Sequence, residues 1–350
     1  MRGFNDRQTL RQFYLVGLVL LAILVALAWQ QMQSPRELSL TTEARAPFNP
    51  VSEPIQPLPE AIAVTADKFA LGERLFNDPR LSNDGHVSCA SCHKLDRGGA
   101  DRTAYSVGLN NLRTTVNTPT VFNLAYNFRF NWNGKFSNLV DHTDALIQNP
   151  RVMGIEWPTL LAKLDAVPDY QQTFDDVYDD GITTANVIDA IVSYETALIT
   201  PNSRFDQYLR GDQTALSSAE LGGYGWFKAY GCVSCHQGVN VGGNMFQKFG
   251  VIGDYFADRG DMTQADLGRY NVTNAEADRY VFRVPSLRNV AVTPPYFHDG
   301  STDTLEQAIN IMVKYQLGRP IPPEHVQQIA QFLQTLTGEY QGGSLSALAP

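Results

Sequence analysis

The chain has 350 residues, of which 43% are hydrophobic and 18% charged, and its formal net charge is −9. A chain of this length and composition is expected to form one large globular domain or two domains of ordinary size. The acidic balance argues against nucleic acid as a partner and is compatible with a basic protein partner.

The N-terminus combines basic residues with an apolar run. Arg2, Arg7 and Arg11 precede an uncharged run from Phe13 to Trp29. This order is typical of export, and the Ala-Leu-Ala sequence at 26–28 would serve as a cleavage site. The 17 residues also reach the lower limit for a membrane span. We therefore expect residues 1–29 to be either a signal peptide or an inner-membrane anchor, with the rest of the chain in the periplasm.

Residues 30–65 predict a linker, because proline prevents both helices and central strands. Six prolines fall in this segment: Pro35, Pro47, Pro50, Pro54, Pro57 and Pro59. A segment of this kind is expected to act as a stiff spacer.

The remainder predicts a mainly α fold. Apolar residues recur at helical spacing in seven segments: 67–76, 159–164, 170–178, 184–199, 217–230, 305–315 and 323–336. Thr183 or Thr184 is expected to begin the fourth segment, and a Ser-Ser-Ala-Glu capping box begins the fifth. Two stretches between them, 94–135 and 237–300, are rich in Gly and Asn and show no sustained strand alternation. Loops of that length usually serve a site.

The four cysteines form two identical spacings. They are Cys89-Ala-Ser-Cys92-His93 and Cys232-Val-Ser-Cys235-His236. Disulfides, redox dithiols or zinc are alternatives for paired cysteines in an exported chain. However, CxxCH is the attachment pattern of c-type haem, in which two thiols bind the vinyl groups and the histidine coordinates the iron. The motifs therefore predict two covalent haems c, one in a domain at 66–210 and one at 211–340.

The sixth ligand of each iron decides what that haem can do. Methionine opposite histidine gives a high-potential electron-transfer haem, whereas an open position permits chemistry with small ligands. The candidates outside the motifs and the leader are His86, His142, His298, His325, Met153, Met245, Met262 and Met312. Spacing alone does not choose among them, and Met312 also suits ordinary core packing on its helix.

From about residue 68 to 337, three quarters of the chain, the sequence resembles the bacterial di-haem cytochrome c peroxidase family, which includes the MauG-type enzymes. The segments that carry the resemblance, besides both CxxCH motifs and the helix of Met312, are Leu71-Gly-Glu-Arg-Leu-Phe76, Asp78-Pro-Arg-Leu-Ser82, Asn117-Thr-Pro-Thr-Val-Phe-Asn123, Trp132-Asn-Gly134, Glu195-Thr-Ala-Leu-Ile-Thr-Pro201, Phe205-Asp-Gln-Tyr-Leu209, Val281-Phe-Arg-Val-Pro-Ser-Leu-Arg-Asn-Val290 and Pro295-Tyr-Phe-His-Asp-Gly300. Their order and spacing fit the family throughout.

The resemblance implies two haem domains with a calcium ion between them. The C-terminal haem would accept electrons from a small donor such as cytochrome c, and the N-terminal haem would reduce hydrogen peroxide to water. Met312 would be the distal ligand of the second haem, where MauG has Tyr. Trp132 matches an electron relay between the haems, although an ordinary buried indole is the alternative. The family is also compatible with a homodimer.

Three residues match the calcium ligands of the family. They are Asn117, through its side chain, and Thr293 and Pro295, through their backbone carbonyls. Oxygen ligands of this kind suit a hard cation.

The sequence departs from the family around the first haem. The histidine that blocks this iron in typical members is replaced by Leu109, which predicts a haem that is open in every redox state. The distal Gln and Glu are replaced by His142 and Val152, and Val152 cannot move a proton. His142 would be a distal acid–base group, a new iron ligand or a surface histidine. A small shift in the match would make Glu156 the nearest acid.

Three functions follow from these residues. The first is a periplasmic di-haem peroxidase, with Trp132 and His142 taking part in catalysis. The second is a MauG-like oxidoreductase acting on another substrate, and the third is a non-enzymatic electron-transfer or sensor protein. Leu109 is neutral between the first two, whereas Val152 favours the second or the third.

Overall fold

The computed structural model describes residues 53–348. The predicted signal peptide or anchor at 1–29, and residues 30–52 of the predicted linker, lie outside this range. Across residues 53–348, no helix is both long and apolar enough to cross a membrane.

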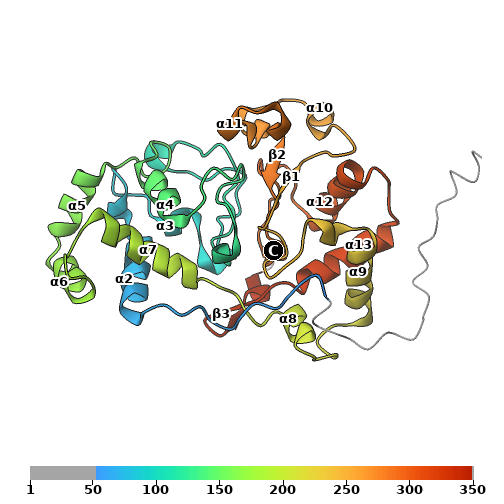
Figure 1. The fold of residues 1–350 in the computed structure, drawn as a ribbon, viewed down its shortest axis with the longest axis horizontal. Helices are drawn as coiled ribbons and strands as arrows, with labels where there is room; N and C mark the ends of the chain where they lie inside the picture. Colours follow the sequence, from blue (N-terminus) through green and yellow to red (C-terminus); the bar gives the residue numbers. More distant parts are fainter. Residues whose placement is uncertain (1–52, 349–350) are drawn as a thin grey trace, which may run out of the picture. The chain divides into compact units, whose positions relative to one another are not determined.

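The described chain is mainly helical, as predicted (Figure 1). Its α-helices are α2 (Ala66–Asn77), α3 (Cys89–Cys92), α4 (Leu139–Gln148), α5 (Trp157–Asp165), α6 (Pro168–Val177), α7 (Thr184–Ala197), α8 (Arg204–Leu209), α9 (Ser218–Ala229), α10 (Tyr255–Arg259), α11 (Tyr270–Thr273), α12 (Leu305–Met312) and α13 (Pro323–Gln334). Two small antiparallel sheets pair β1 (Phe246–Lys248) with β2 (Val281–Arg283), and β3 (Glu339–Tyr340) with β4 (Gly343–Ser344).

Local capping explains where the predicted helices begin. The Thr183 side chain accepts a hydrogen bond from the backbone N–H of Asn186 at 3.2 Å, which satisfies a free donor in the first turn of α7. Ser217 and Glu220 form the expected capping box at the start of α9. All seven predicted helical segments are present, with ends that differ by a few residues.

The helices that were not predicted are the short helices α3, α8, α10 and α11, and the longer helix α4. The α4 sequence places Asp141, His142, Thr143 and Asp144 in succession, so polar residues mask its apolar period. Asn138 caps this helix by accepting from the backbone N–H of Asp141 at 2.8 Å. Helix α8 is only six residues long and begins with a capping box.

Two helix pairs dominate the core (Figure 1). In each pair, the two helices come closest to each other at a glycine. In the pair of α2 and α7, a β-carbon on Gly72 would lie 2.1 Å from the carbonyl oxygen of Ala190. In the pair of α9 and α13, a β-carbon on Gly223 would lie 1.9 Å from the carbonyl oxygen of Gln328. Only glycine permits these approaches. The pair of α2 and α7 lies beside the first CxxCH motif, and the pair of α9 and α13 lies beside the second.

Each end of the described chain packs against the half of the protein that contains the CxxCH motif farther from it in sequence. Ile55 forms a bridge with Gly238, and Ile55 and Leu58 are fully buried. This part of the predicted linker is therefore packed against the protein instead of standing free as a spacer. At the other end, Leu345 joins a core cluster that contains Phe76 and Tyr194.

Candidate functional site

The second CxxCH motif follows directly from α9. Gly231 adopts a left-handed conformation (φ 81°), which ends the helix and leads into a 3-10 turn at Cys232–Ser234. The backbone N–H of His236 then donates to the carbonyl of Cys232 at 2.9 Å. Both thiols and the imidazole line one cavity of about 540 Å³. The local backbone therefore presents all three haem-attachment groups to a single space.

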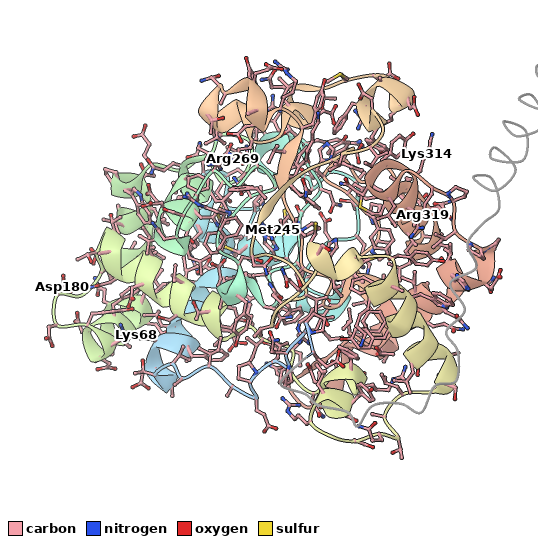
Figure 2. All side chains as sticks on the ribbon, turned by 45° about the vertical axis from the view of Figure 1, so that its right-hand side comes forward. Lys68, Asp180, Met245, Arg269, Lys314 and Arg319 are labelled. Atoms are coloured by element: carbon pink, nitrogen blue, oxygen red, sulfur yellow. The ribbon has the colours of Figure 1, made fainter. Side chains whose placement is uncertain are left out.

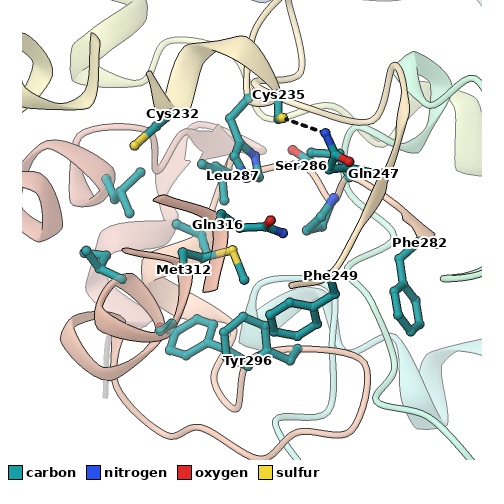
Figure 3. Close-up of a pocket in the computed structure, with 18 of the residues that line it drawn as sticks. Cys232, Cys235, Gln247, Phe249, Phe282, Ser286, Leu287, Tyr296, Met312 and Gln316 are labelled. Carbon is teal, nitrogen blue, oxygen red and sulfur yellow. Dashed lines mark hydrogen bonds between the residues drawn. The ribbon is translucent and has the colours of Figure 1, made fainter. Parts of the chain in front are cut away.

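Met312 lines the same cavity from α12. It is the last residue of that helix, and the chain continues as a π-helix over Val313–Leu317. A π-helical turn is often found at a functional site because it re-aims the side chains around it. Figure 3 shows Met312 on the opposite side of the pocket from the sulfurs of Cys232 and Cys235. The structure therefore brings the predicted axial methionine to the cavity of the second motif.

The lining of this cavity fits a haem. It is mostly apolar, with Phe249, Leu287 and Leu333 among its walls. Its volume is in the range of cofactor sites. Burial lowers the pKa of His236 to about 4, so the ring is neutral, which is the form that binds iron.

The first CxxCH motif forms the short helix α3, held by a capping box between Ser88 and Ser91. Its histidine, His93, is bonded through Nδ1 to the carbonyl of Gly99 at 3.2 Å. Such a bond fixes the ring and leaves Nε2 as the iron ligand. Burial also lowers the pKa of His93, which favours the neutral ring. This motif thus also fits haem attachment.

The alternatives for the cysteines find no support. All four cysteines lie within residues 53–348 and are free thiols. The one cluster of potential metal-binding side chains in that range is Asp266, His298 and Asp299, and it contains no cysteine. Arg259 pairs with both carboxylates of this cluster, so the guanidinium already balances their negative charge and takes the place of a cation.

His142 is half-buried, and two aromatic rings lie beside it. Its ring centroid lies 5.7 Å from that of Phe130 and 5.5 Å from that of Phe136. Nε2 is 3.0 Å from the side-chain oxygen of Asn131, whereas Nδ1 is buried and has no partner among the described residues. His142 is therefore half-buried, with its Nδ1 atom turned away from solvent.

The pKa of His142 is lowered to about 4, first by burial and then by His93 and Arg283. At neutral pH the ring is uncharged. With Nε2–H donating to Asn131, Nδ1 is a free acceptor.

The structure places Leu109 and Val152 side by side. The backbone N–H of Leu109 donates to the carbonyl of Val152 at 2.9 Å, and the Leu109 side chain is buried. Val152 packs against an apolar cluster together with Cys89. Glu156 is exposed, immediately before α5, and is not the buried acid that a shifted match would require.

The other predicted residues gather on the wall of the second cavity. Trp132, Asn117, Thr293 and Pro295 all line it. Trp132 donates through Nε1 to the backbone carbonyl of Asn117 at 2.9 Å. The predicted relay and the predicted calcium ligands are therefore neighbours.

Two buried residues that form no ion pair among the described residues were given no role from the sequence, although both lie in segments that carry the family resemblance. Glu195 is buried, its Oε2 has no partner within the described range, and burial raises its pKa to about 8. Arg283 is also buried and lines the second cavity. An arginine or glutamate in a motif gives no sign of whether it is paired, so only the structure reveals these two.

Comparisons with known proteins agree with this geometry. The family model described as di-haem cytochrome c peroxidase matches residues 66–214. The chain is 42% identical over 290 residues to cytochrome c peroxidase Ccp of Escherichia coli, covering 83% of this chain and 62% of that protein. It is 41% identical over 300 residues to cytochrome c551 peroxidase of Nitrosomonas europaea, covering 85% of this chain and 88% of the relative.

Among solved structures, a MauG-like protein associated with microbial copper homeostasis superposes with a TM-score of 0.70. It is 28% identical in sequence, and the match covers 85% of this chain and 96% of that one. The chain therefore belongs to the di-haem cytochrome c peroxidase family, a family of oxidoreductases whose two c-type haems correspond to the two CxxCH motifs.

Proposed function

We propose that the chain is a periplasmic di-haem peroxidase that reduces hydrogen peroxide to water with electrons from a small donor such as cytochrome c. The observation that carries the proposal is Met312 facing the cavity of the second CxxCH motif. Histidine on one side and methionine on the other give a haem that is closed to substrate and suited to electron transfer. We assign residues 66–210 to the peroxidatic haem domain and residues 211–340 to the electron-transfer domain.

Electrons would enter at the second haem. Its cavity is lined in part by Val251, whose side chain is 52% exposed, next to Ile252 at 63%. An exposed apolar pair beside a cofactor cavity suits a transient contact with a donor protein. Trp132 lines the same cavity and donates to the carbonyl of Asn117, so it is our candidate relay.

The first haem would be the peroxide site. Leu109 cannot ligate iron, so no side chain at that position closes the site in the oxidised state. When bound, the haems supply two electrons to each peroxide, so that one peroxide and two protons give two water molecules. His142 would move the proton between the two oxygens through Nδ1, which its bond to Asn131 leaves free.

A calcium site is part of the proposal. Asn117, Thr293 and Pro295 line one wall, and each offers an oxygen atom. The Asn117 amide donates through Nδ2 to the carbonyl of Thr103 at 2.8 Å, which turns Oδ1 away from that bond. An ion held here would fix the backbone that binds Trp132.

A second candidate is a MauG-like oxidoreductase that acts on another substrate. The observation that favours it is Val152, which supplies no acid where typical peroxidases have glutamate. Met312 opposes it, because MauG has tyrosine at that position.

The experiment is an optical and EPR spectrum of the oxidised protein with both haems, followed by turnover of peroxide with reduced cytochrome c. We expect a high-spin signal before any reduction, and two reduced cytochromes consumed per peroxide. Two low-spin haems without turnover would overturn the peroxidase function. Oxidation of the protein by peroxide without catalytic consumption of cytochrome c would favour the MauG-like alternative.

A further inference from the structure

Arg283 is a fully enclosed cation on the wall of the second haem cavity. It is the last residue of β2 and is 4% exposed. Its backbone N–H donates to the carbonyl of Trp132 at 2.8 Å, so it is attached directly to the segment of the candidate relay. Its side chain lines the cavity that also contains Cys232 and Cys235.

The guanidinium of Arg283 is poorly satisfied by the protein. Its Nη1 donates to the neutral side-chain oxygen of Asn127 at 3.1 Å, and its Nε has no partner in the described part of the chain. Burial lowers the pKa of Arg283 to about 10, and no acidic neighbour opposes this shift. Buried charges in proteins are normally paired, because an isolated charge loses its hydration without compensation.

Arg288, five residues further on, shows what a satisfied arginine looks like in the same wall. Both of its terminal nitrogens bind the Asp206 carboxylate, at 3.1 and 3.0 Å. Its Nε donates to the carbonyl of Val239, and Nη2 also donates to that of Gln56. Arg288 therefore needs no further anion, whereas Arg283 does.

We propose that Arg283 binds a propionate carboxylate of the haem attached at Cys232 and Cys235. The haem is the anion that this cavity receives, and its propionates lie at the edge away from the vinyl groups that bind the thiols. Arg283 reaches this cavity from β2, whereas the two thiols reach it from the turn that follows α9. Guanidinium and carboxylate are matched in geometry for paired hydrogen bonds.

This contact has a consequence for electron entry. A positive charge beside the haem disfavours the ferric state, which carries one more positive charge than the ferrous state. Arg283 therefore raises the reduction potential of the second haem, both directly and by neutralising the propionate. It also couples the charged edge of that haem to the backbone of Trp132.

The test is the reduction potential of the low-spin haem in Arg283→Gln, measured by spectroelectrochemical titration of the protein with both haems and without peroxide. We expect the equilibrium constant for reduction to fall about tenfold, which is ~59 mV for a one-electron couple. Arg283→Lys keeps the charge but loses the paired geometry, so its potential should fall less.

The matched control is Arg269→Gln. Arg269 (Figure 2) is also largely enclosed, but it stacks on the ring of Phe246 at 4.1 Å and pairs with Asp278 at 3.6 Å, outside the cavity lining. The reduction potential of the second haem should be unchanged in Arg269→Gln. An unchanged potential in Arg283→Gln with full haem content would overturn the proposal, as would a shift confined to the first haem.

If Arg283→Gln does not mature, Arg283→Met, which also lacks the charge, takes its place, and an unchanged potential of the second haem in that variant overturns the proposal. The measurement uses no peroxide and rests only on attachment of the second haem. Its result is therefore independent of whether the proposed peroxidase function holds.

Discussion

Under the proposed function, the chemistry at the first CxxCH motif would depend on the ring of His142. Phe130 and Phe136 flank it, and Asn131 fixes its tautomer. Nδ1 is left as a buried acceptor, while Val152 provides no acid nearby. A neutral histidine of this kind can accept one peroxide proton and return it to the departing oxygen.

The first prediction concerns that ring. His142→Ala should lower kcat for peroxide by a factor of about 10²–10⁴, the usual contribution of a general acid–base. His86→Ala, which changes an exposed histidine, is the control. Stopped-flow oxidation of reduced cytochrome c measures both. A His142→Ala enzyme with the parent kcat would remove His142 from the mechanism.

The pH dependence of His142 follows from its low pKa. In the folded protein its pKa is about 4, below the ordinary 6.5, so the ring stays neutral until the pH falls to about 4. The unfolded chain binds this proton first, so the contribution of His142 to stability is lost as pH falls from 6.5 to about 4. Turnover that depends on His142 should fall through the same lower limit. An activity that rises as the pH drops below about 4 would contradict this role.

Leu109 gives a third prediction at the residue scale. Its backbone is fixed to that of Val152, so Leu109→His would place an imidazole on the same loop as the blocking histidine of typical members. We expect the high-spin signal of the oxidised protein to decrease and turnover to require prior reduction of the second haem. Leu109→Ala is the control and should keep the high-spin signal. EPR of the oxidised proteins distinguishes the two outcomes.

At the scale of elements, a buried ion pair joins α8 to three distant segments. Arg288 and Asp206 are both fully buried, and the Asp206 carboxylate also accepts the backbone N–H of Leu58 at 3.2 Å. Arg288 in turn binds the carbonyls of Gln56 and Val239. The pair therefore attaches the segment 53–58, which the sequence predicted as a spacer, to the wall of the second cavity.

Removing one partner of this pair should be costly. Asp206→Asn leaves the Arg288 charge buried and unpaired, so we expect the free energy of unfolding to fall by about 3–5 kcal/mol. Lys314→Ala, which breaks the exposed pair with Asp258, should change it little. Urea unfolding followed by circular dichroism measures both. Equal stability of the two variants would show that the buried pair does not hold these elements together.

At the scale of the whole molecule, the predicted calcium ligands come from segments far apart in the sequence. Asn117 precedes α4, whereas Thr293 and Pro295 precede α12, and all three line one cavity. An ion bound there would link the two halves of the chain beside Trp132.

Calcium removal tests this link. At a calcium concentration 100 times Kd, binding should stabilise the protein by about 2.7 kcal/mol relative to a chelated sample. Thermal unfolding and peroxide turnover should both fall on chelation and return with calcium. Asn117→Ala should abolish the difference between the two samples. Identical unfolding of the parent protein with and without calcium would exclude the site.

Much of the fold could be predicted because its determinants are local. Helix α9 can be recognised from its own capping residues and apolar period. Each CxxCH motif predicts haem attachment from five consecutive residues. Helix α4 was missed because its period is hidden by polar residues, one of which is His142. Residues that serve a site often break the local rules by which an element is recognised.

The sequence by itself determined that two haems are attached, where they are attached, and that the fold is mainly helical, since covalent attachment and helix formation depend on neighbouring residues. Only the tertiary structure decided which side chains meet across the chain. It placed Met312 in the cavity of Cys232, covered the Nδ1 atom of His142 and left Arg283 without an anion among the described residues. Burial and pairing are properties of the folded packing, so the identity of a residue cannot reveal them in advance.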